Sequence, residues 1–212
     1  MGFESMRASY DRIASEYTRR IADELAAKPF DRGILDRFAE TLAGKGRICD
    51  LACGPGHVAH YLHERGADVF GLDFSPGMVR EAQARYPAIT FVEGDMTALP
   101  LDDASLAGIV AFYGICNIPE SMLPKAFAEM QRVLEPGGRL LIAFHIGDGA
   151  ESVSELWGHA VSLEFFRYSP PKITALLACA GFFIDETRER APYPPEVEYQ
   201  SHRAYILSHR RD

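Results

Sequence analysis

This sequence lacks an excess of positive charge. Its 22 Lys and Arg residues are outnumbered by 30 Asp and Glu residues, so the formal net charge is −8. Proteins that bind nucleic acid usually carry a basic surface, because phosphate contacts dominate their affinity. The densest basic stretch here is His209-Arg210-Arg211, for which a solvated tail is the simplest interpretation. We therefore expect no nucleic-acid partner.

Cysteine is scarce, and long apolar runs are missing. The four cysteines, Cys49, Cys53, Cys116 and Cys179, form no C-x-x-C pair and have no histidines at zinc-finger spacing, so we expect no metal site. No apolar run approaches the roughly 20 residues that cross a bilayer. The first residues also lack the basic and then apolar pattern of a signal peptide. These absences predict a cytoplasmic protein without a membrane partner; they leave the oligomeric state open.

The composition that is present suits an ordinary globular domain. Hydrophobic residues make up 47% of the 212 residues and charged residues 25%, which is typical of a chain that buries a normal core. We expect a single domain over 1–212 with four parts. They are an N-terminal helical cap (1–44), a core (45–146), an irregular aromatic insert that acts as a lid (147–169), and a C-terminal helix with two strands (170–212).

Short apolar runs alternate with helical patterns from residue 47 onward. The predicted strands are 47–51, 68–72, 89–92, 106–112, 139–145, 182–187 and 203–208, and the predicted core helices are 58–65, 76–86 and 121–134. This alternation predicts an α/β fold with a doubly wound, mostly parallel sheet. A further helix is expected over 170–180, and two helices over 4–43 with a break at Lys28-Pro29.

A glycine-containing turn, Cys53-Gly54-Pro55-Gly56, follows the first predicted strand. Glycine lets the backbone turn sharply and lets a ligand approach without a Cβ clash, although many such turns need glycine only for packing. A dinucleotide site normally has G-x-G-x-x-G and holds a pyrophosphate at the helix N-terminus. Here Pro55 offers no amide donor, and Asp50 would repel a pyrophosphate. A ligand with an ammonium or sulfonium group suits Asp50 better.

Acidic residues follow the next two predicted strands. Asp73 ends the second strand, where a carboxylate can accept hydrogen bonds from the two hydroxyls of a ribose. Its alternative role is to cap the next helix, for which Ser75 is better placed. Asp95-Met96 follows the third strand and can read the edge of an adenine. Because ligands of doubly wound sheets bind at the carboxyl ends of the strands, these loops predict one nucleoside site.

Taken together, these residues resemble the class I S-adenosylmethionine-dependent methyltransferases, in particular the broad group related to the menaquinone/ubiquinone methyltransferases. The resemblance rests on residues 50–56, 71–78, 93–96 and 132–138 and spans roughly residues 45–145. It implies a Rossmann-like, seven-stranded sheet whose last strand is antiparallel. It also implies S-adenosylmethionine as the methyl donor, with S-adenosylhomocysteine as the product.

The resemblance further implies which positions contact the cofactor. Asp50 and the backbone of 52–54 would hold the methionine part, and residues 111–113 would flank the sulfonium. Asp73 would bind the ribose, and the two tyrosines of the first helix, seven residues apart on one face, would lean over the cofactor. The full set is Tyr10, Tyr17, Asp50, Ala52, Cys53, Gly54, Asp73, Phe74, Met78, Asp95, Met96, Ala111 and Phe112. Ala52 stands where the commonest family pattern has glycine.

Catalytic groups are less clearly marked. An activated methyl donor needs mainly an aligned nucleophile, and a general base is optional. His145, which ends the fifth predicted strand, and Tyr113, which follows the fourth, are the candidate catalytic residues. The alternatives are a structural histidine bonded to a backbone group for His145 and simple packing for Tyr113. His159 lies in the insert and has no clear placement.

The acceptor is expected to be a small molecule, because an aromatic lid suits an apolar or aromatic ligand better than a polymer. The alternatives are an RNA or protein methyltransferase and a cofactor-binding protein without turnover. A nicotinamide-dependent oxidoreductase is a third alternative, disfavoured by the turn at Pro55. The sequence does not predict whether the acceptor atom is O, N, C or S.

Overall fold

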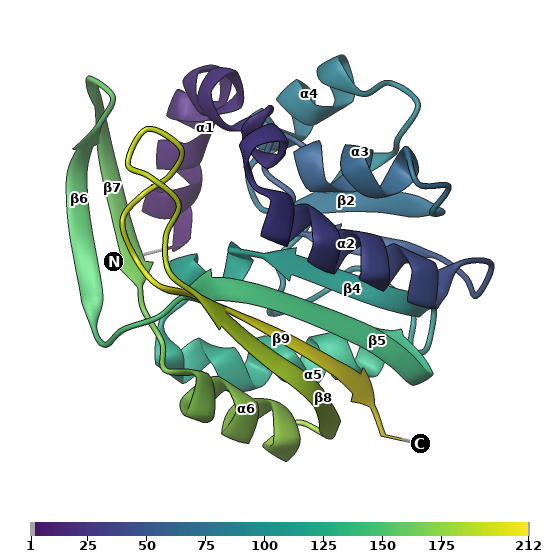
Figure 1. The fold of residues 1–212 in the computed structure, drawn as a ribbon. Helices are drawn as coiled ribbons and strands as arrows, with labels where there is room; N and C mark the ends of the chain where they lie inside the picture. Colours follow the sequence, from purple (N-terminus) through teal and green to yellow (C-terminus); the bar gives the residue numbers. More distant parts are fainter. Residues whose placement is uncertain (1–2, 212) are drawn as a thin grey trace.

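A seven-stranded sheet forms the centre of the protein, a computed structural model of which describes residues 3–211 (Figure 1). The first five strands run parallel, and the sixth in spatial order is antiparallel to both of its neighbours. This is the doubly wound, mostly parallel sheet that the sequence predicts. In spatial order the strands are β3 (Phe91–Glu93), β2 (Val69–Asp73), β1 (Ile48–Leu51), β4 (Leu106–Phe112), β5 (Leu134–His145), β9 (Arg203–Arg210) and β8 (Phe182–Arg190).

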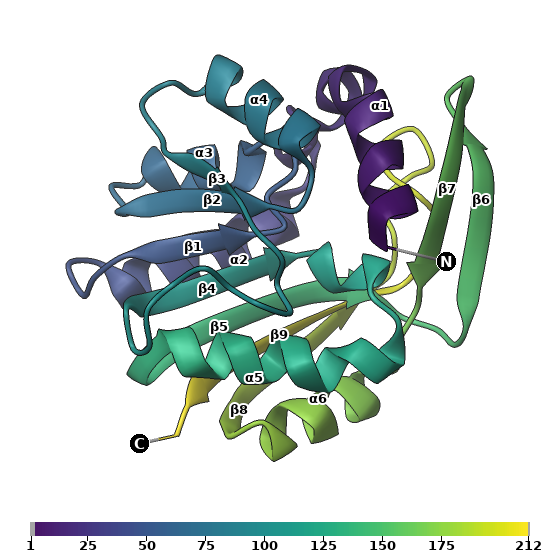
Figure 2. The same cartoon turned by 180° about the vertical axis from the view of Figure 1, so that it is seen from behind.

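Helices cover both faces of this sheet, and each face has its own apolar core. α2 (Pro29–Leu42), α3 (His57–His63) and α4 (Pro76–Arg85) contribute to one core cluster. α5 (Leu123–Val133) and α6 (Pro170–Cys179) contribute to the other and lie together in Figure 2. β4 is buried along its whole length, with Ile109 in one cluster and Val110 in the other. That burial on two faces explains its unbroken apolar sequence.

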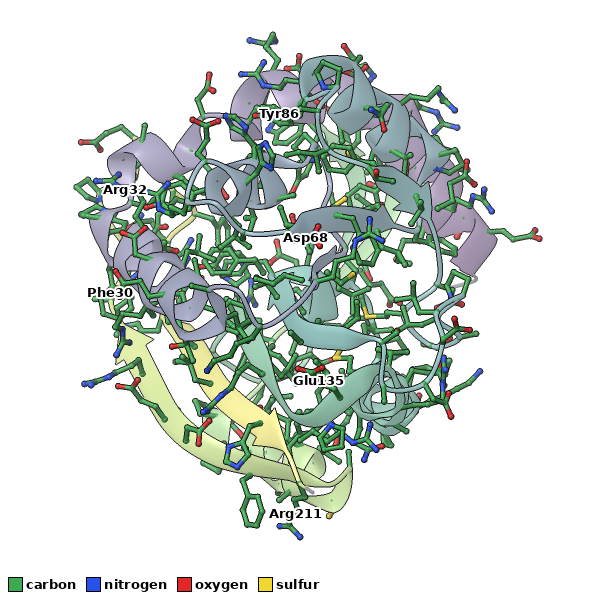
Figure 3. The ribbon with its side chains drawn as sticks, turned by 90° about the vertical axis from the view of Figure 1, so that its right-hand side faces the viewer. Phe30, Arg32, Asp68, Tyr86, Glu135 and Arg211 are labelled. Atoms are coloured by element: carbon green, nitrogen blue, oxygen red, sulfur yellow. The ribbon has the colours of Figure 1, made fainter. Side chains whose placement is uncertain are left out.

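Helix boundaries follow from local chemistry. Pro29 occupies the first turn of α2, as expected. Ser75 caps α4, because its Oγ accepts the N–H of Met78 at 3.1 Å, which confirms its predicted role. The start of α2, where Figure 3 labels Phe30, packs on β9 on the same face of the sheet. The ring centroids of Phe30 and Tyr205 lie 5.2 Å apart.

The prediction for the end of α5 holds to within one residue, but the prediction for the start of β5 is wrong by five residues. The helix ends at Val133, and β5 begins at Leu134, where a strand was expected only from residue 139. Leu134 pairs with Leu106, and the next pair is Arg139 with Gly108, so the Pro-Gly-Gly segment bulges out between them. Proline and glycine end the helix, but they do not keep the chain out of the sheet.

The prediction that the insert at 147–169 is irregular is wrong, because the insert contains an antiparallel hairpin. Its strands are β6 (Ala150–Leu156) and β7 (His159–Phe166), joined by Trp157-Gly158, both with positive φ (54° and 82°). Val161 and Leu163 pack on Ile13 of α1 (Phe3–Ile21). The hairpin thereby stands beside α1 in both cartoon views (Figures 1 and 2). None of the helices within residues 3–211 has the length and apolar character to cross a membrane.

Candidate functional site

The turn after β1 has an unusual backbone that brings it close to its neighbours. Ala52, Gly54 and Gly56 all adopt positive φ angles, of 58°, 53° and 78°. A Cβ on Gly56 would meet the ring of Phe91 at 2.6 Å, so β3 packs directly against the turn. Ala52 pays a conformational cost that glycine would avoid, yet the alanine is accommodated here.

Asp73 connects this turn to the one after β2. Its Oδ2 accepts the N–H of Gly54 at 2.7 Å, and its Oδ1 accepts the N–H of Ser75 at 2.8 Å. Burial raises the pKa of Asp73 to about 6, against the opposing effect of these backbone hydrogen bonds. The backbone N–H of Phe74 also hydrogen-bonds this carboxylate, and since a carboxylate offers about four acceptor sites, part of its capacity remains for a ligand.

A cavity of about 120 Å³, here the first cavity, lies over these two turns. It brings together eleven residues of the predicted site, from α1 and from the loops after β1 to β4. They are Tyr10, Tyr17, Ala52, Gly54, Asp73, Phe74, Met78, Asp95, Met96, Phe112 and Tyr113. Sequence reasoning missed Met6 and Asn117, which also line it, because their positions depend on how α1 and the segment after β4 dock.

α1 covers the first cavity and contributes Tyr10 and Tyr17 to its lining. The hydroxyl of Tyr10 donates to Oδ1 of Asn117 at 2.7 Å, and the Tyr10 and Tyr17 rings meet edge to face at 6.1 Å. Asp11, on the same helix, accepts the hydroxyl of Ser75 at 2.6 Å and the N–H of Gly77 at 2.7 Å. The cap is therefore hydrogen-bonded to both edges of the cavity that it covers.

The remaining predicted cofactor residues differ in how they reach the cavity. Phe74 has the guanidinium of Arg7 at 5.6 Å from its ring centroid, while Met78 is buried in the cavity wall. Asp95 accepts the N–H of Thr97 at 2.7 Å through Oδ1. Ala111 lines neither cavity, because its side chain is fully buried in the core cluster on the α5 side.

A second cavity of about 230 Å³ adjoins the first. The two share five lining residues, namely Tyr17, Ala52, Gly54, Phe112 and Tyr113. Asp50 and Cys53 of the predicted site line this second cavity rather than the first. The cavities therefore meet at the turn after β1 and at the end of β4.

Asp50 is a buried acid in the wall of the second cavity. Its Oδ2 accepts the N–H of Ala59 in α3 at 2.8 Å. Burial raises its pKa to about 7, although His57 acts in the opposite direction. Cys53 is buried as well, and burial raises the pKa of its thiol, so it is a packing residue rather than a nucleophile.

His145 and Tyr113 lie side by side in the wall of the second cavity, with ring centroids 5.0 Å apart. His145 shares a hydrogen bond of 2.6 Å between Nδ1 and the hydroxyl of Ser201. Burial, together with nearby cations, lowers the pKa of His145 to about 4, so the ring is neutral at pH 7. Burial raises the pKa of Tyr113, whose hydroxyl bonds that of Tyr205 at 3.0 Å. Neither group is a strong base near neutral pH.

His159 takes no part in either cavity. It is the first residue of β7, next to the turn of the hairpin, and the lining of neither cavity includes it.

A buried charged network, which sequence reasoning missed, completes the second cavity. Lys28 is almost fully buried, and its Nζ lies 2.6 Å from Glu24 and 3.5 Å from Glu198. Glu198 also pairs with Arg190 at 2.5 Å and with Arg203 at 3.0 Å. These residues come from segments up to 179 positions apart in the chain (24 to 203), so no local sequence pattern predicts their contact.

Fold and cavities together place this chain among the Rossmann-like proteins with a methyltransferase-type sheet. Its structure resembles that of the 1,6-didemethyltoxoflavin-N1-methyltransferase of Burkholderia thailandensis with a TM-score of 0.73. The resemblance covers 99% of this chain and 88% of the other at 19% identity, so it concerns the fold.

Sequence comparisons identify the family. The family described as a methyltransferase domain matches residues 48–138. The demethylmenaquinone methyltransferase of Thermus thermophilus is 42% identical over 166 residues, 65% of this chain and 74% of the relative. The one from Renibacterium salmoninarum is 34% identical over 142 residues, 66% of this chain and 58% of the relative. This chain belongs to the methyltransferase family. It spans only 40% to 60% of the length of several curated relatives.

Proposed function

We propose that this chain is an S-adenosylmethionine-dependent methyltransferase that acts on a small-molecule acceptor. One observation carries the proposal. The cavity beside Asp73 and Asp95 adjoins a second cavity, with which it shares lining residues at the ends of β1 and β4. Two adjoining cavities suit an enzyme that must bring a nucleoside-bearing donor next to a separate acceptor.

The residues of the first cavity fit the adenosine part of the cofactor. Asp73 keeps acceptor capacity beyond its backbone hydrogen bonds, which we assign to the ribose hydroxyls. Leu72, Met78 and Ile118 offer apolar surface to a planar base. Gly114 also lines this cavity. A Cβ at this position would lie 2.7 Å from the Cβ of Ala52, so a larger residue would crowd the cavity wall.

The turn after β1 fits the amino-acid part. Asp50 lines the second cavity next to this turn, and one of its oxygens already accepts the N–H of Ala59. Its second oxygen is available to an ammonium group, which would stabilise the ionised acid that burial disfavours. Tyr17 lies at the junction of the two cavities and lines both.

Catalysis by this chain would rest on alignment rather than on a base. When bound, S-adenosylmethionine supplies a methyl group on a positively charged sulfur. Tyr113 and His145 are held by Tyr205 and Ser201, and their pKa shifts make both poor bases at neutral pH. They would position the acceptor and exclude water, and such positioning can contribute about 7–11 kcal/mol to lowering the barrier.

α1 and the β6–β7 hairpin would act as the lid of the site. They pack on one another through Ile13, Val161 and Leu163, and α1 contacts the cavity through its tyrosines. A lid of this kind excludes water and completes the site once ligands have entered. We regard this cap, the core and the C-terminal strands as one domain.

A small acceptor agrees with the charge of the chain and with its relatives. A net charge of −8 disfavours RNA, and the family includes demethylmenaquinone methyltransferases. We also propose a cytoplasmic location, because Cys49, Cys53, Cys116 and Cys179 are free thiols, as is usual in a reducing compartment.

The proposal is tested by incubating the chain with S-adenosylmethionine and a library of small metabolites while S-adenosylhomocysteine is measured. We expect product only with particular small molecules. Transfer to RNA or to protein in parallel reactions would favour the first alternative function. Tight cofactor binding without any transfer would favour a non-catalytic binding protein.

A further inference from the structure

The wall that the two cavities share is hydrogen-bonded to a buried aspartate on α2. The hydroxyl of Tyr113 lies 3.0 Å from that of Tyr205, and the Tyr205 hydroxyl lies 2.9 Å from Oδ1 of Asp31. Asp31 and Tyr205 are fully buried and line neither cavity, whereas Tyr113 lines both. Asp31 therefore has no direct contact with the cofactor site proposed above, but it is connected to that site through two phenols.

Donors and acceptors in this chain of hydrogen bonds can be assigned. Nη2 of Arg190 donates to Oδ2 of Asp31 at 2.8 Å, and its Nε donates to the Tyr205 oxygen at 2.9 Å. Arginine can only donate and an ionised carboxylate can only accept, so Tyr205 donates its proton to Asp31. The Tyr113 hydroxyl then donates to Tyr205, and it also lies 3.4 Å from Oδ1 of Asp31. The Tyr113 side chain is thereby held at its hydroxyl end and has no proton left for a ligand.

Tyr113 is held at its backbone as well. Its φ is 63°, in the left-handed region that bulky residues rarely adopt. Its N–H donates to the carbonyl oxygen of Ala143 in β5 at 2.9 Å. A costly backbone conformation persists only where the surrounding structure holds it, and such positions cluster at functional sites. Backbone and hydroxyl together fix the place of the Tyr113 ring.

The alternative role of Asp31 is to clamp α2 onto the C-terminal strands, since Arg190 ends β8 and Tyr205 lies in β9. Burying an ion pair carries a desolvation penalty, and well-packed apolar residues are often as stabilising. A clamp therefore does not by itself require an acid at this position. An acid is required if the direction of the hydrogen bonds through Tyr205 matters.

The wall shared by the two cavities is also the place of the cofactor sulfur. In S-adenosylmethionine the sulfur joins the adenosine to the amino-acid part. With the adenosine beside Asp73 in the first cavity and the amino-acid part beside Asp50 in the second, the sulfur lies at the residues common to both linings. Three of these five residues are aromatic, namely Tyr17, Phe112 and Tyr113.

Aromatic rings at this wall distinguish the two forms of the cofactor. The Phe112 and Tyr113 rings meet at 81° with centroids 5.1 Å apart, so they form a corner rather than a flat surface. The face of an aromatic ring attracts a cation. The sulfur of S-adenosylmethionine is positively charged, whereas that of S-adenosylhomocysteine is neutral. A correctly placed ring therefore stabilises the donor and not the product.

We propose that Asp31 is a positioning residue, which acts through Tyr205 to hold the Tyr113 ring against the positively charged sulfur of the methyl donor. The inference rests on the proposed function, because it needs a donor that spans the two cavities. It gives Asp31 an effect on the preference for S-adenosylmethionine over S-adenosylhomocysteine without contact to either. Loss of the charge on transfer also removes this attraction, which favours release of the product.

Calorimetry with both ligands tests this role, because they differ by one methyl group and one charge. The measured quantity is the dissociation constant of S-adenosylhomocysteine divided by that of S-adenosylmethionine. Asp31→Asn leaves one oxygen where two now accept, from Tyr205 and from Arg190. We expect this ratio to fall about two- to fivefold, the effect of one cation–π contact. Tyr205→Phe, which removes a single oxygen, should lower the ratio by a similar factor.

A double-mutant cycle shows whether Asp31 acts through Tyr113. Tyr113→Phe removes the hydroxyl that the chain of hydrogen bonds holds, so Asp31→Asn should not lower the ratio further in that background. Asp36→Asn is the matched control. Asp36 lies on the same helix and accepts the hydroxyl of Tyr61 at 2.9 Å, but Tyr61 lines neither cavity. The ratio in Asp36→Asn should equal that of the wild type.

A clamp without a positioning role would lower the free energy of unfolding in Asp31→Asn and Tyr205→Phe but leave the ratio unchanged, and that result would overturn the inference. Additive losses in Asp31→Asn and Tyr113→Phe, or an equal loss in Asp36→Asn, would overturn it too. If Asp31→Asn does not fold, the ratio in Tyr205→Phe decides. A wild-type chain that binds neither ligand would refute the proposed function itself, and the inference with it.

Discussion

Asp73 joins the two turns that frame the first cavity, and its ionisation is finely balanced. Burial raises its pKa to about 6, while the N–H groups of Ser75 and Gly54 favour the charged form. Ribose hydroxyls donate best to the charged form. Ligand binding and proton release at this residue are therefore coupled.

We predict from this coupling that affinity for S-adenosylhomocysteine increases as the pH rises through about 6. Below that pH the carboxyl must lose a proton before it can accept both hydroxyls, so the affinity should fall by up to about tenfold per pH unit. Calorimetry between pH 5 and 8 measures this. Asp73→Asn should bind weakly and show a flatter profile, and a wild-type affinity that does not vary over this range would contradict the assignment.

Asp50 supplies a second prediction at the scale of one residue, this time for stability. Burial raises its pKa from 3.8 to about 7, so between these values the folded chain holds a proton that the unfolded chain has lost. The contribution of Asp50 to stability is complete below about pH 4 and is lost as the pH rises through 7, by at most about 1.4 kcal/mol per pH unit.

Asp50→Asn isolates this effect, because the amide oxygen can still accept the N–H of Ala59. Denaturant unfolding of both proteins at pH 4.5 to 7.5 should show wild type losing stability relative to the variant as the pH rises. If the difference in unfolding free energy between the two proteins stays constant over this pH range, the raised pKa of Asp50 in the folded chain is contradicted.

Among the elements, α1 matters most for the site because it covers the first cavity. It crosses the start of α4 closely, where a Cβ on Gly77 would come within 2.9 Å of the Asp11 Cα. Asp11 accepts two hydrogen bonds from α4 and its cap. The two helices thus dock through one carboxylate and one glycine.

We predict that Asp11→Ala and Gly77→Ala each loosen α1 while the sheet stays folded. Loss of the hydrogen bonds should cost about 1–2 kcal/mol, and the methyl group of Gly77→Ala should push α1 outward. Hydrogen exchange should become faster in α1, and S-adenosylhomocysteine should dissociate faster. Asp36→Ala, which removes bonds to Tyr61 and Arg65 on the surface between α2 and α3, is the control; equal exchange in α1 for all three variants would contradict this docking.

The elements also differ in how well the sequence predicts them. β4 and β2 are buried on both faces, and their continuous apolar runs define them almost to the residue. β6 has no fully buried residue, and its sequence of small and charged residues resembles a loop. Its strand structure depends on pairing with β7 and on the turn at Trp157-Gly158, which are not local properties.

At the scale of the whole molecule, the two cavities differ in how far the sequence predicts them. Every loop of the first cavity directly follows a predicted strand, so the parallel sheet itself brings Asp73 and Asp95 together. The buried charged network of the second cavity combines Lys28 with Glu198 and Arg203, which come together only when β5 and β9 have paired. Contacts between residues so far apart in the chain produce no characteristic spacing in the sequence, so they could not be predicted from it.

The most direct test of the central claim is a calorimetric titration of the chain with S-adenosylhomocysteine, with NAD as the comparison ligand. We predict a dissociation constant near the micromolar range for the first and no detectable heat for NAD. Asp73→Ala should bind at least about tenfold less tightly with an unchanged circular dichroism spectrum. Asp68→Ala, an exposed acid just before the same strand, should bind as wild type does. Binding of NAD without S-adenosylhomocysteine, or unchanged affinity in Asp73→Ala, would contradict the account.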